Sequence, residues 1–314
     1  MKPTSEYHKP FQSPGLASWR HEEDHLPAPA HITFKNILFA TDFSSATGVA
    51  LPYAVEIARR SGATIHAVHV VQPDIYPLVP PSEWPRRGQK EEEFRNEKRN
   101  QLEEELQGLP HEFLFREGEV WQNMASIIED KDIDLLILGT HGHTGIGKII
   151  MGSVAEKIFR QAACPVLTVG PCVPSEERYA VAARFNCVLY ATDFSPESLA
   201  AAPYAISFAR EHSAQLVLLH AIEVAKQGEL DSALQTLREV VPLGTQLATK
   251  AQCLVERGAP AVAILKATAD HKTDLVVVGV RNARGHITTT THFTHSVAYE
   301  VVVQVTCPVL TVRG

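Results

Sequence analysis

The sequence predicts an α/β protein made of two tandem, doubly wound domains, and three observations lead to this prediction. Short apolar runs typical of buried strands alternate with segments of helical spacing. A long block of the chain occurs twice, and in the first copy a strand runs into a glycine-rich loop and then into a helix. Continuously apolar strands that alternate with helices form parallel sheets covered on both faces. Right-handed crossovers make such a sheet doubly wound.

The elements of the first copy follow from local signals. Asp42 and Ser44 after the first strand are good N-cap residues for the next segment. Gly62 is expected to end the first long helix, and a proline-rich loop is expected from Pro73 to Pro85. The expected strands are 36–41, 64–70, 112–115, 134–138 and 165–169, and the expected helices are 49–60, 90–106, 120–129 and 152–161.

The two copies can be aligned residue by residue over long stretches, with identical or similar residues at matching positions. The segment Ile37–Ser44 recurs as Val188–Ser195, and Cys164–Val169 recurs as Cys307–Val312. A repeat this long indicates a duplicated domain, and 314 residues divide into two domains that can each bury a core. We expect a disordered or extended N-terminal arm (1–33), a first domain (34–170), a linker (171–184) and a second domain (185–314).

Composition narrows the class of protein. The net charge of −7 leaves no basic surface for a nucleic-acid partner. No apolar run reaches the roughly 18–20 residues that a membrane span needs. The five cysteines include no Cys-x-x-Cys pair, and an odd count in a chain of this size indicates a reducing compartment. We therefore expect a cytoplasmic protein that does not interact with membranes.

The glycine-rich loop is the most informative segment. Gly139 and Gly142 follow the buried strand, and Gly152 and Ser153 open the next helix. Glycines let the backbone approach an anion closely and permit positive φ. The helix N-terminus beyond them offers free N–H groups and a positive dipole end. The segment therefore predicts a phosphate-binding loop at the carboxyl end of a strand, where ligands of doubly wound sheets bind.

With these motifs, the chain resembles the universal stress protein family in its tandem two-domain form. Both copies carry the opening strand with its Thr-Asp-Phe-Ser turn and the closing Cys-Pro-Val-Leu-Thr-Val strand. The ATP-binding branch of this family carries Gly-x-x-Gly, nine residues and then Gly-Ser or Gly-Thr. The stretch from Gly139 to Ser153 matches that pattern completely.

The resemblance implies a set of ligand contacts in the first domain. Asp42 would accept a hydrogen bond from a ribose hydroxyl, the Val70 backbone would lie against adenine, and the helix start would hold the phosphates. The ligand implied is ATP, with Mg²⁺ or Mn²⁺ bridging its phosphates. The expected binding residues are Thr41, Asp42, Val70, Gly139, Gly142, Gly152, Ser153 and Val154.

The resemblance also implies an architecture. Each domain is expected to be a five-stranded parallel sheet in the order 3-2-1-4-5 with helices on both faces. Because relatives pair through their last strands, the halves are expected to form an internal pseudo-dimer across Val166–Val169 and Val309–Val312. A further homodimer is left open.

The second copy departs from the pattern where binding would occur. Asn282 replaces the second glycine, and His295-Ser296 replaces Gly-Ser. The run Thr288–Thr291 places β-branched residues, which disfavour positive φ, in the loop. We therefore expect ATP in the first domain only, and a degenerate nucleotide loop in the second.

Other interpretations of the same residues remain. Gly142–Lys148 resembles a P-loop but has Ile149 where a hydroxyl should hold Mg²⁺. A zinc site at His286, His292 and His295 has no recognisable ligand spacing. His69 and His220 are interpreted as structural.

No catalytic residues can be assigned, because neither a Ser-His-Asp set nor paired carboxylates are recognisable. The expected function is a nucleotide-responsive binding or regulatory module of the stress response, whose partners are an adenine nucleotide and an unidentified protein. The alternatives are a slow ATPase and a structural stress protein without bound nucleotide.

Overall fold

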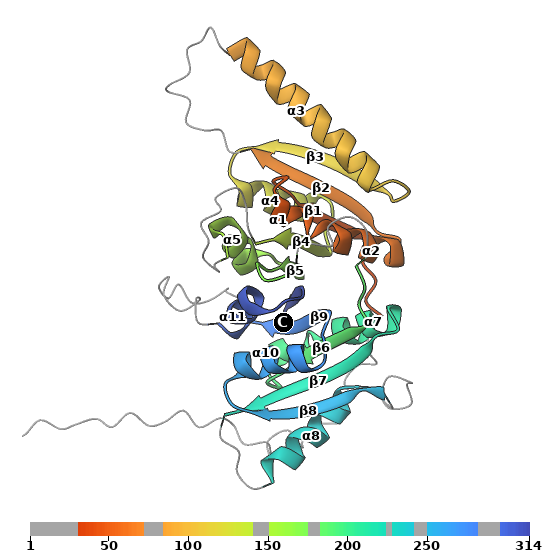
Figure 1. Cartoon of the computed structure of the whole chain (residues 1–314), viewed down its shortest axis with the longest axis vertical. Helices are drawn as coiled ribbons and strands as arrows, with labels where there is room; N and C mark the ends of the chain where they lie inside the picture. The colour runs from red at the N-terminus through yellow and green to blue at the C-terminus, as the bar shows by residue number, and fades with distance from the viewer. Residues whose placement is uncertain are drawn as a thin grey trace, which may run out of the picture. The chain divides into compact units, whose positions relative to one another are not determined.

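The computed structural model describes residues 31–71, 84–140, 151–174, 183–223, 228–241, 250–281 and 296–314. Across these ranges, strands and helices alternate along both repeats, so the predicted fold class is confirmed (Figure 1). The expected N-terminal arm lies almost entirely outside the described residues.

The first repeat follows the predicted order of elements. It contains β1 (Asn36–Ala40), α1 (Ser45–Gly48), α2 (Leu51–Ser61), β2 (Thr64–Val71), α3 (Trp84–Glu105), β3 (His111–Glu117), α4 (Val120–Asp130), β4 (Leu135–Gly139), α5 (Ser153–Gln161) and β5 (Val166–Val169). Helix α3 begins earlier than predicted, at Trp84, so that Pro85 lies in its first turn. Proline is tolerated there because the first N–H groups of a helix have no intrahelical acceptor.

The second repeat has the same succession. It contains β6 (Cys187–Ala191), α6 (Pro196–Leu199), α7 (Ala202–Glu211), β7 (Gln215–Ile222), α8 (Glu229–Val240), β8 (Gln252–Arg257), α10 (Pro260–Asp270), β9 (Leu275–Val280), α11 (Val297–Gln304) and β10 (Val309–Arg313).

The strands of both repeats form one continuous sheet of ten strands, in the order β3-β2-β1-β4-β5-β10-β9-β6-β7-β8. Each repeat thus has the strand order that the family resemblance implies. The expected pairing of the two repeats through their last strands is confirmed: β5 and β10 pair antiparallel, with Leu167 opposite Leu310, and join the two five-stranded sets into one sheet. Every other neighbouring pair is parallel.

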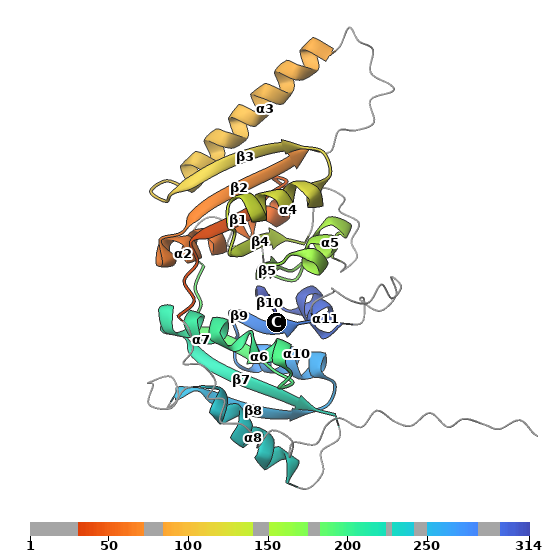
Figure 2. The ribbon, with the colours of Figure 1, turned by 180° about the vertical axis from the view of Figure 1, so that it is seen from behind.

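Each face of this sheet carries a core that runs through both repeats. Alternation along β1 sends Ile37 and Phe39 to one core and Leu38 to the other. Residues of α2 and α7 belong to the first core, and residues of α4, α5, α10 and α11 to the second. Figures 1 and 2 show these two groups of helices on opposite sides of the sheet.

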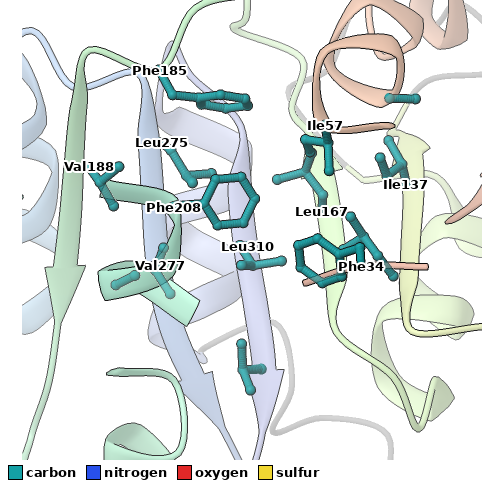
Figure 3. Close-up of a cluster of buried hydrophobic side chains, with 14 of the residues drawn as sticks. Phe34, Ile57, Ile137, Leu167, Phe185, Val188, Phe208, Leu275, Val277 and Leu310 are labelled. Carbon is teal, nitrogen blue, oxygen red and sulfur yellow. The ribbon is translucent and has the colours of Figure 1, made fainter. Parts of the chain in front are cut away.

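The first core crosses the junction between the repeats. Phe34 and Leu167 of the first repeat pack in the same cluster as Phe208 and Leu310 of the second (Figure 3). The rings of Phe34 and Phe208 lie with centroids 5.9 Å apart. Burial of these side chains is therefore shared, and neither repeat encloses this core alone.

The two repeats also approach each other closely at their backbones, and side chains of the second repeat bind carbonyl groups of the first. A Cβ on Gly170 would overlap the Val302 carbonyl oxygen of the other repeat. The Arg313 guanidinium donates across the junction to the Phe159 carbonyl at the end of α5. The Thr311 hydroxyl donates to the Val166 carbonyl at 3.2 Å. Gly170 is thus required by the close approach of the two repeats.

We expect Gly170→Ala to lower the free energy of unfolding by about 1–3 kcal/mol, because the added methyl forces backbone atoms apart. Denaturant unfolding followed by circular dichroism measures this. Val262→Ala, at a side chain that is 64% exposed, serves as the control and should change stability by less than about 0.5 kcal/mol. Equal unfolding curves for both variants would contradict the packing argument.

A partly buried polar cluster also links the repeats. His212 at the end of α7 lies 3.7 Å from the Glu56 carboxylate of α2, and Arg60 Nε donates to the same carboxylate at 3.0 Å. The imidazole packs against the rings of Phe185 and Phe208. Burial and the Arg60 charge lower the pKa of His212, while Glu56 acts in the opposite direction.

Because the pKa of His212 is lowered in the folded protein, the free energy of unfolding is expected to decrease as the pH falls. In the unfolded chain this histidine takes up a proton below its ordinary pKa of about 6.5, whereas the folded protein resists protonation. The stability contributed by neutral His212 is therefore lost as the pH falls through about 6.5. We expect the unfolding free energy of the wild type to fall more steeply than that of His212→Gln between about pH 7.5 and 5.5. Parallel curves would contradict this expectation.

Candidate functional site

The Thr-Asp-Phe-Ser turn after β1 is held by hydrogen bonds of its own. Asp42 Oδ1 accepts from the Ser44 amide at 2.9 Å and from the Thr47 hydroxyl at 3.0 Å. The Thr41 hydroxyl accepts from the Phe43 amide at 3.0 Å, and Phe43 has a φ of 59°. Such a backbone is uncommon for a bulky residue, and these bonds fix it.

His69 holds the same turn from the neighbouring strand β2. Its Nδ1 lies 2.8 Å from the Thr41 carbonyl oxygen. A carbonyl oxygen only accepts, so Nδ1 carries the proton and donates. The second repeat repeats the contact between His220 and the Thr192 carbonyl, also at 2.8 Å. Both histidines thus have the structural role that the sequence predicts.

The start of helix α5 lies against the end of β4. The Gly152 amide donates to the Thr140 carbonyl at 3.0 Å, and a Cβ on Gly152 would lie 3.2 Å from that same oxygen. The φ of Gly152 is −61°, so the glycine serves the close approach and not a left-handed backbone. As the N-cap it has no side chain to bind the N–H groups of the first turn.

The turn and the helix start border one pocket at the carboxyl ends of β1, β2 and β4. The pocket opens to solvent and measures about 310 Å³, at the lower end of the range of small-molecule sites. All of the predicted binding residues that the structure describes line it: Thr41, Asp42, Val70, Gly139, Gly152, Ser153 and Val154. Gly142 lies outside the described residues.

Several lining residues were not found by sequence reasoning. Val120 and Met124 come from α4, and Ala155 and Ile158 come from α5. They form an apolar wall of the pocket. Their helical spacing in the sequence predicts that they face the interior, but it does not distinguish a pocket wall from a packed core. Thr47 also lines the pocket, and the sequence could have indicated it. The second repeat has another hydroxyl residue, Ser198, at the matching position.

An ion pair connects the two helices beside the pocket. Glu119, the N-cap of α4, accepts from the Gln122 amide at 2.6 Å and from Lys157 Nζ of α5 at 2.8 Å. The Lys157 ammonium, followed by the Gln122 amide, holds the pKa of Glu119 below its ordinary value. This carboxylate therefore stays charged at neutral pH.

The second repeat has a pocket at the equivalent place, but its helix start differs. Here Ser296 is the N-cap of α11, and its hydroxyl accepts from the Tyr299 amide at 3.2 Å. A Cβ on Gly279 would overlap the Glu197 carbonyl oxygen. Gly279 is thus explained by packing against α6, and one N–H of the helix start is satisfied by the protein itself.

The alternative sites cannot be located. Residues 142–149 of the P-loop-like segment, and His286, His292 and His295, lie outside the described residues. Among the residues that are described, no group of three or more histidine, cysteine or acidic side chains is placed to hold a metal ion. Nor does any described helix have the length and apolar character to span a membrane.

We expect His69→Leu and His220→Leu to lower the free energy of unfolding by similar amounts, about 1–3 kcal/mol each. Each change removes the N–H that satisfies a threonine carbonyl in a tight turn. Urea unfolding of the two variants measures the loss, and the repeats serve as controls for each other. A loss in neither variant would show that the turns are held without the histidines.

The comparisons with known proteins give one consistent result. A model of the universal stress protein family matches residues 33–170 and 184–313. Universal stress protein MJ0531 of Methanocaldococcus jannaschii is 34% identical over 141 residues, covering 43% of this chain and 82% of the relative. Universal stress protein A homolog 1 of Coxiella burnetii is 33% identical over 141 residues, covering 43% of this chain and 96% of the relative.

A solved structure covers both repeats. The crystal structure of a universal stress protein from Archaeoglobus fulgidus aligns with a TM-score of 0.68 and 20% sequence identity, covering 88% of this chain and 98% of that one. At this identity the likeness shows the fold alone.

Proposed function

The chain belongs to the universal stress protein family, and from this premise we propose that it binds ATP in its first domain and acts as a nucleotide-responsive regulatory module. The domains proposed are residues 34–170 and 185–314. Binding of ATP by the second domain is not part of the proposal.

The observation that carries the proposal is the pocket of the first repeat. Residues separated by more than a hundred positions in sequence, such as Asp42 and Ser153, line the same cavity. Its apolar wall suits a base, its acidic turn suits a sugar, and its helix start suits phosphates. These three chemistries together favour a nucleotide over a purely apolar ligand.

The individual roles follow from the chemistry of each group. Asp42 Oδ1 already accepts two hydrogen bonds within the turn, which fixes the carboxylate for a ribose hydroxyl. Val70, at the end of β2, would present its backbone to the adenine edge. The first-turn N–H groups of α5 and the Ser153 hydroxyl would hold the phosphates, helped by the positive end of the helix dipole.

The helix starts support placing ATP in the first domain. Gly152 leaves the N-terminus of α5 to a ligand, whereas Ser296 caps α11 with its own hydroxyl. An anion at α11 would have to replace that internal hydrogen bond. The same proposal includes Mg²⁺ or Mn²⁺ bridging the phosphates, a cytoplasmic location and an unidentified protein partner.

We expect wild-type protein to hold about one ATP per chain, counted by mass spectrometry of the nucleotide released on denaturation. Asp42→Ala should weaken ATP binding at least about tenfold, because a hydrogen bond to a charged group contributes about 1.5–3 kcal/mol. Gly152→Val should also weaken it, since the side chain occupies the phosphate position. Isothermal titration with ATP and Mg²⁺ measures both.

The matched substitution in the second repeat, Asp193→Ala, tests whether ATP binds in the first domain only. The stoichiometry of ATP should stay at one per chain in this variant. Two ATP per wild-type chain would contradict binding in the first domain only. No ATP, with no thermal shift on its addition, would remove the proposed function and leave a structural stress protein.

A further inference from the structure

Another pocket lies at the amino end of β6, at the opposite edge of the sheet from the pocket beside Asp42. It is lined by Glu56 and Arg60 of α2, by His212 after α7 and by residues 183–186 before β6, and it measures about 240 Å³. This is below the range of sites for drug-sized molecules. It leaves room for a small ion and several waters, since a water molecule takes about 30 Å³.

The His212 side chain indicates that something binds in this pocket. Its imidazole is only 3% exposed, and its Nδ1 lies 3.7 Å from Glu56 Oε1. Within the described part of the chain, this imidazole makes no hydrogen bond. Buried polar side chains nearly always have a hydrogen-bond partner. Because the rings of Phe185 and Phe208 pack against the imidazole (Figure 3), the pocket is the place where a partner would bind.

The charges around the pocket favour an anion. The Glu56 carboxylate is already compensated, because Arg60 Nε donates to its Oε1 at 3.0 Å and Arg59 lies 3.8 Å from its Oε2. The Arg60 guanidinium also donates to the Glu211 carbonyl at 3.1 Å, which offsets the negative end of the α7 dipole. Arg184 is exposed and has no ion pair or hydrogen bond among the described residues. Its positive charge is therefore left without a counter-charge.

The same pocket offers N–H donors of three kinds. The Arg184 guanidinium can bind two oxygens of one phosphate group through parallel N–H bonds. Asn186 is exposed, and its side-chain amide, which has two N–H donors, has no partner in the described ranges. Burial and the Arg60 charge lower the pKa of His212, so at neutral pH its imidazole is neutral and donates from one ring nitrogen. These donors suit a tetrahedral oxyanion.

We propose that this pocket binds the phosphate group of a free phosphate ion or of a small phosphomonoester, held by Arg184, Asn186 and His212 with Arg60 of the first repeat beside it. The bound group supplies the acceptor that the buried imidazole lacks and the negative charge that Arg184 lacks. Because Arg60 belongs to the first repeat and His212 to the second, the phosphate also links the two repeats. The site is separate from the proposed ATP pocket and does not depend on it.

The test follows the imidazole signals of His212 by NMR at constant neutral pH, while inorganic phosphate is added to the full chain. The variant His212→Gln assigns these signals. In the wild type they should shift and saturate with phosphate, but not with chloride at the same ionic strength. Arg184→Gln should weaken phosphate binding at least about tenfold, because it removes hydrogen bonds to a charged group. Arg184→Lys keeps the charge without the planar fork and should recover part of the affinity.

Arg257→Gln is the matched control, because Arg257 is also exposed, ends strand β8 and does not line this pocket. It should bind phosphate as the wild type does. Glycerol phosphate, added in place of the ion, distinguishes the two sources: tighter binding of the ester identifies a phosphomonoester, and tighter binding of the ion identifies free phosphate. No saturable shift of His212 in the wild type, or equal phosphate affinity of Arg184→Gln and Arg257→Gln, would overturn the proposal.

Thermal unfolding tests the link between the repeats. Phosphate stabilises many proteins without binding to a site, so the comparison between variants decides. The melting temperature should rise more with phosphate in the wild type and in Arg257→Gln than in Arg184→Gln, and an equal rise in all three would contradict the link. Failure of the ATP proposal is measured separately, as wild-type protein that binds no ATP, because the His212 signals report on this pocket.

Discussion

The antiparallel pairing of β5 with β10 is the contact on which the rest of the molecule depends. It joins two parallel five-stranded sets into one sheet, and it lets each hydrophobic core extend through both repeats. Edge strands carry unpaired N–H and C=O groups that favour pairing with another chain. Here each repeat closes the edge of the other, so the duplication supplies within one chain what separate domains would supply as a dimer.

This arrangement explains why the site can diverge between repeats. The shared sheet and its cores hold the carboxyl ends of the strands in both halves, and the turns at Asp42 and Asp193 keep nearly the same hydrogen bonds. The helix starts at the same edge differ between the repeats, since α5 has an uncapped start at Gly152 and α11 has a capped one at Ser296.

Much of the fold and part of the candidate site could be predicted from the sequence. The repeat, the alternation of strands and helices and the positions of Thr41, Asp42, Gly152 and Ser153 in one pocket all agree with expectation. The structure adds that Gly152 has an ordinary φ and that a Cβ at this position would lie close to the Thr140 carbonyl oxygen. The start of α3 was also placed too late, since proline is tolerated in a first turn.

What the sequence determined by itself is local: strand and helix periodicity, the Thr-Asp-Phe-Ser turns and the duplication, because each is encoded within a few neighbouring residues or by direct self-similarity. Only the tertiary structure decided why Gly170 must be a glycine beside Val302, and which apolar side chains of α4 and α5 form the pocket wall. It also decided that Arg281 and Glu197 line the second pocket. These facts depend on distances between segments far apart in the chain, and residue spacing along a sequence carries no information about such distances.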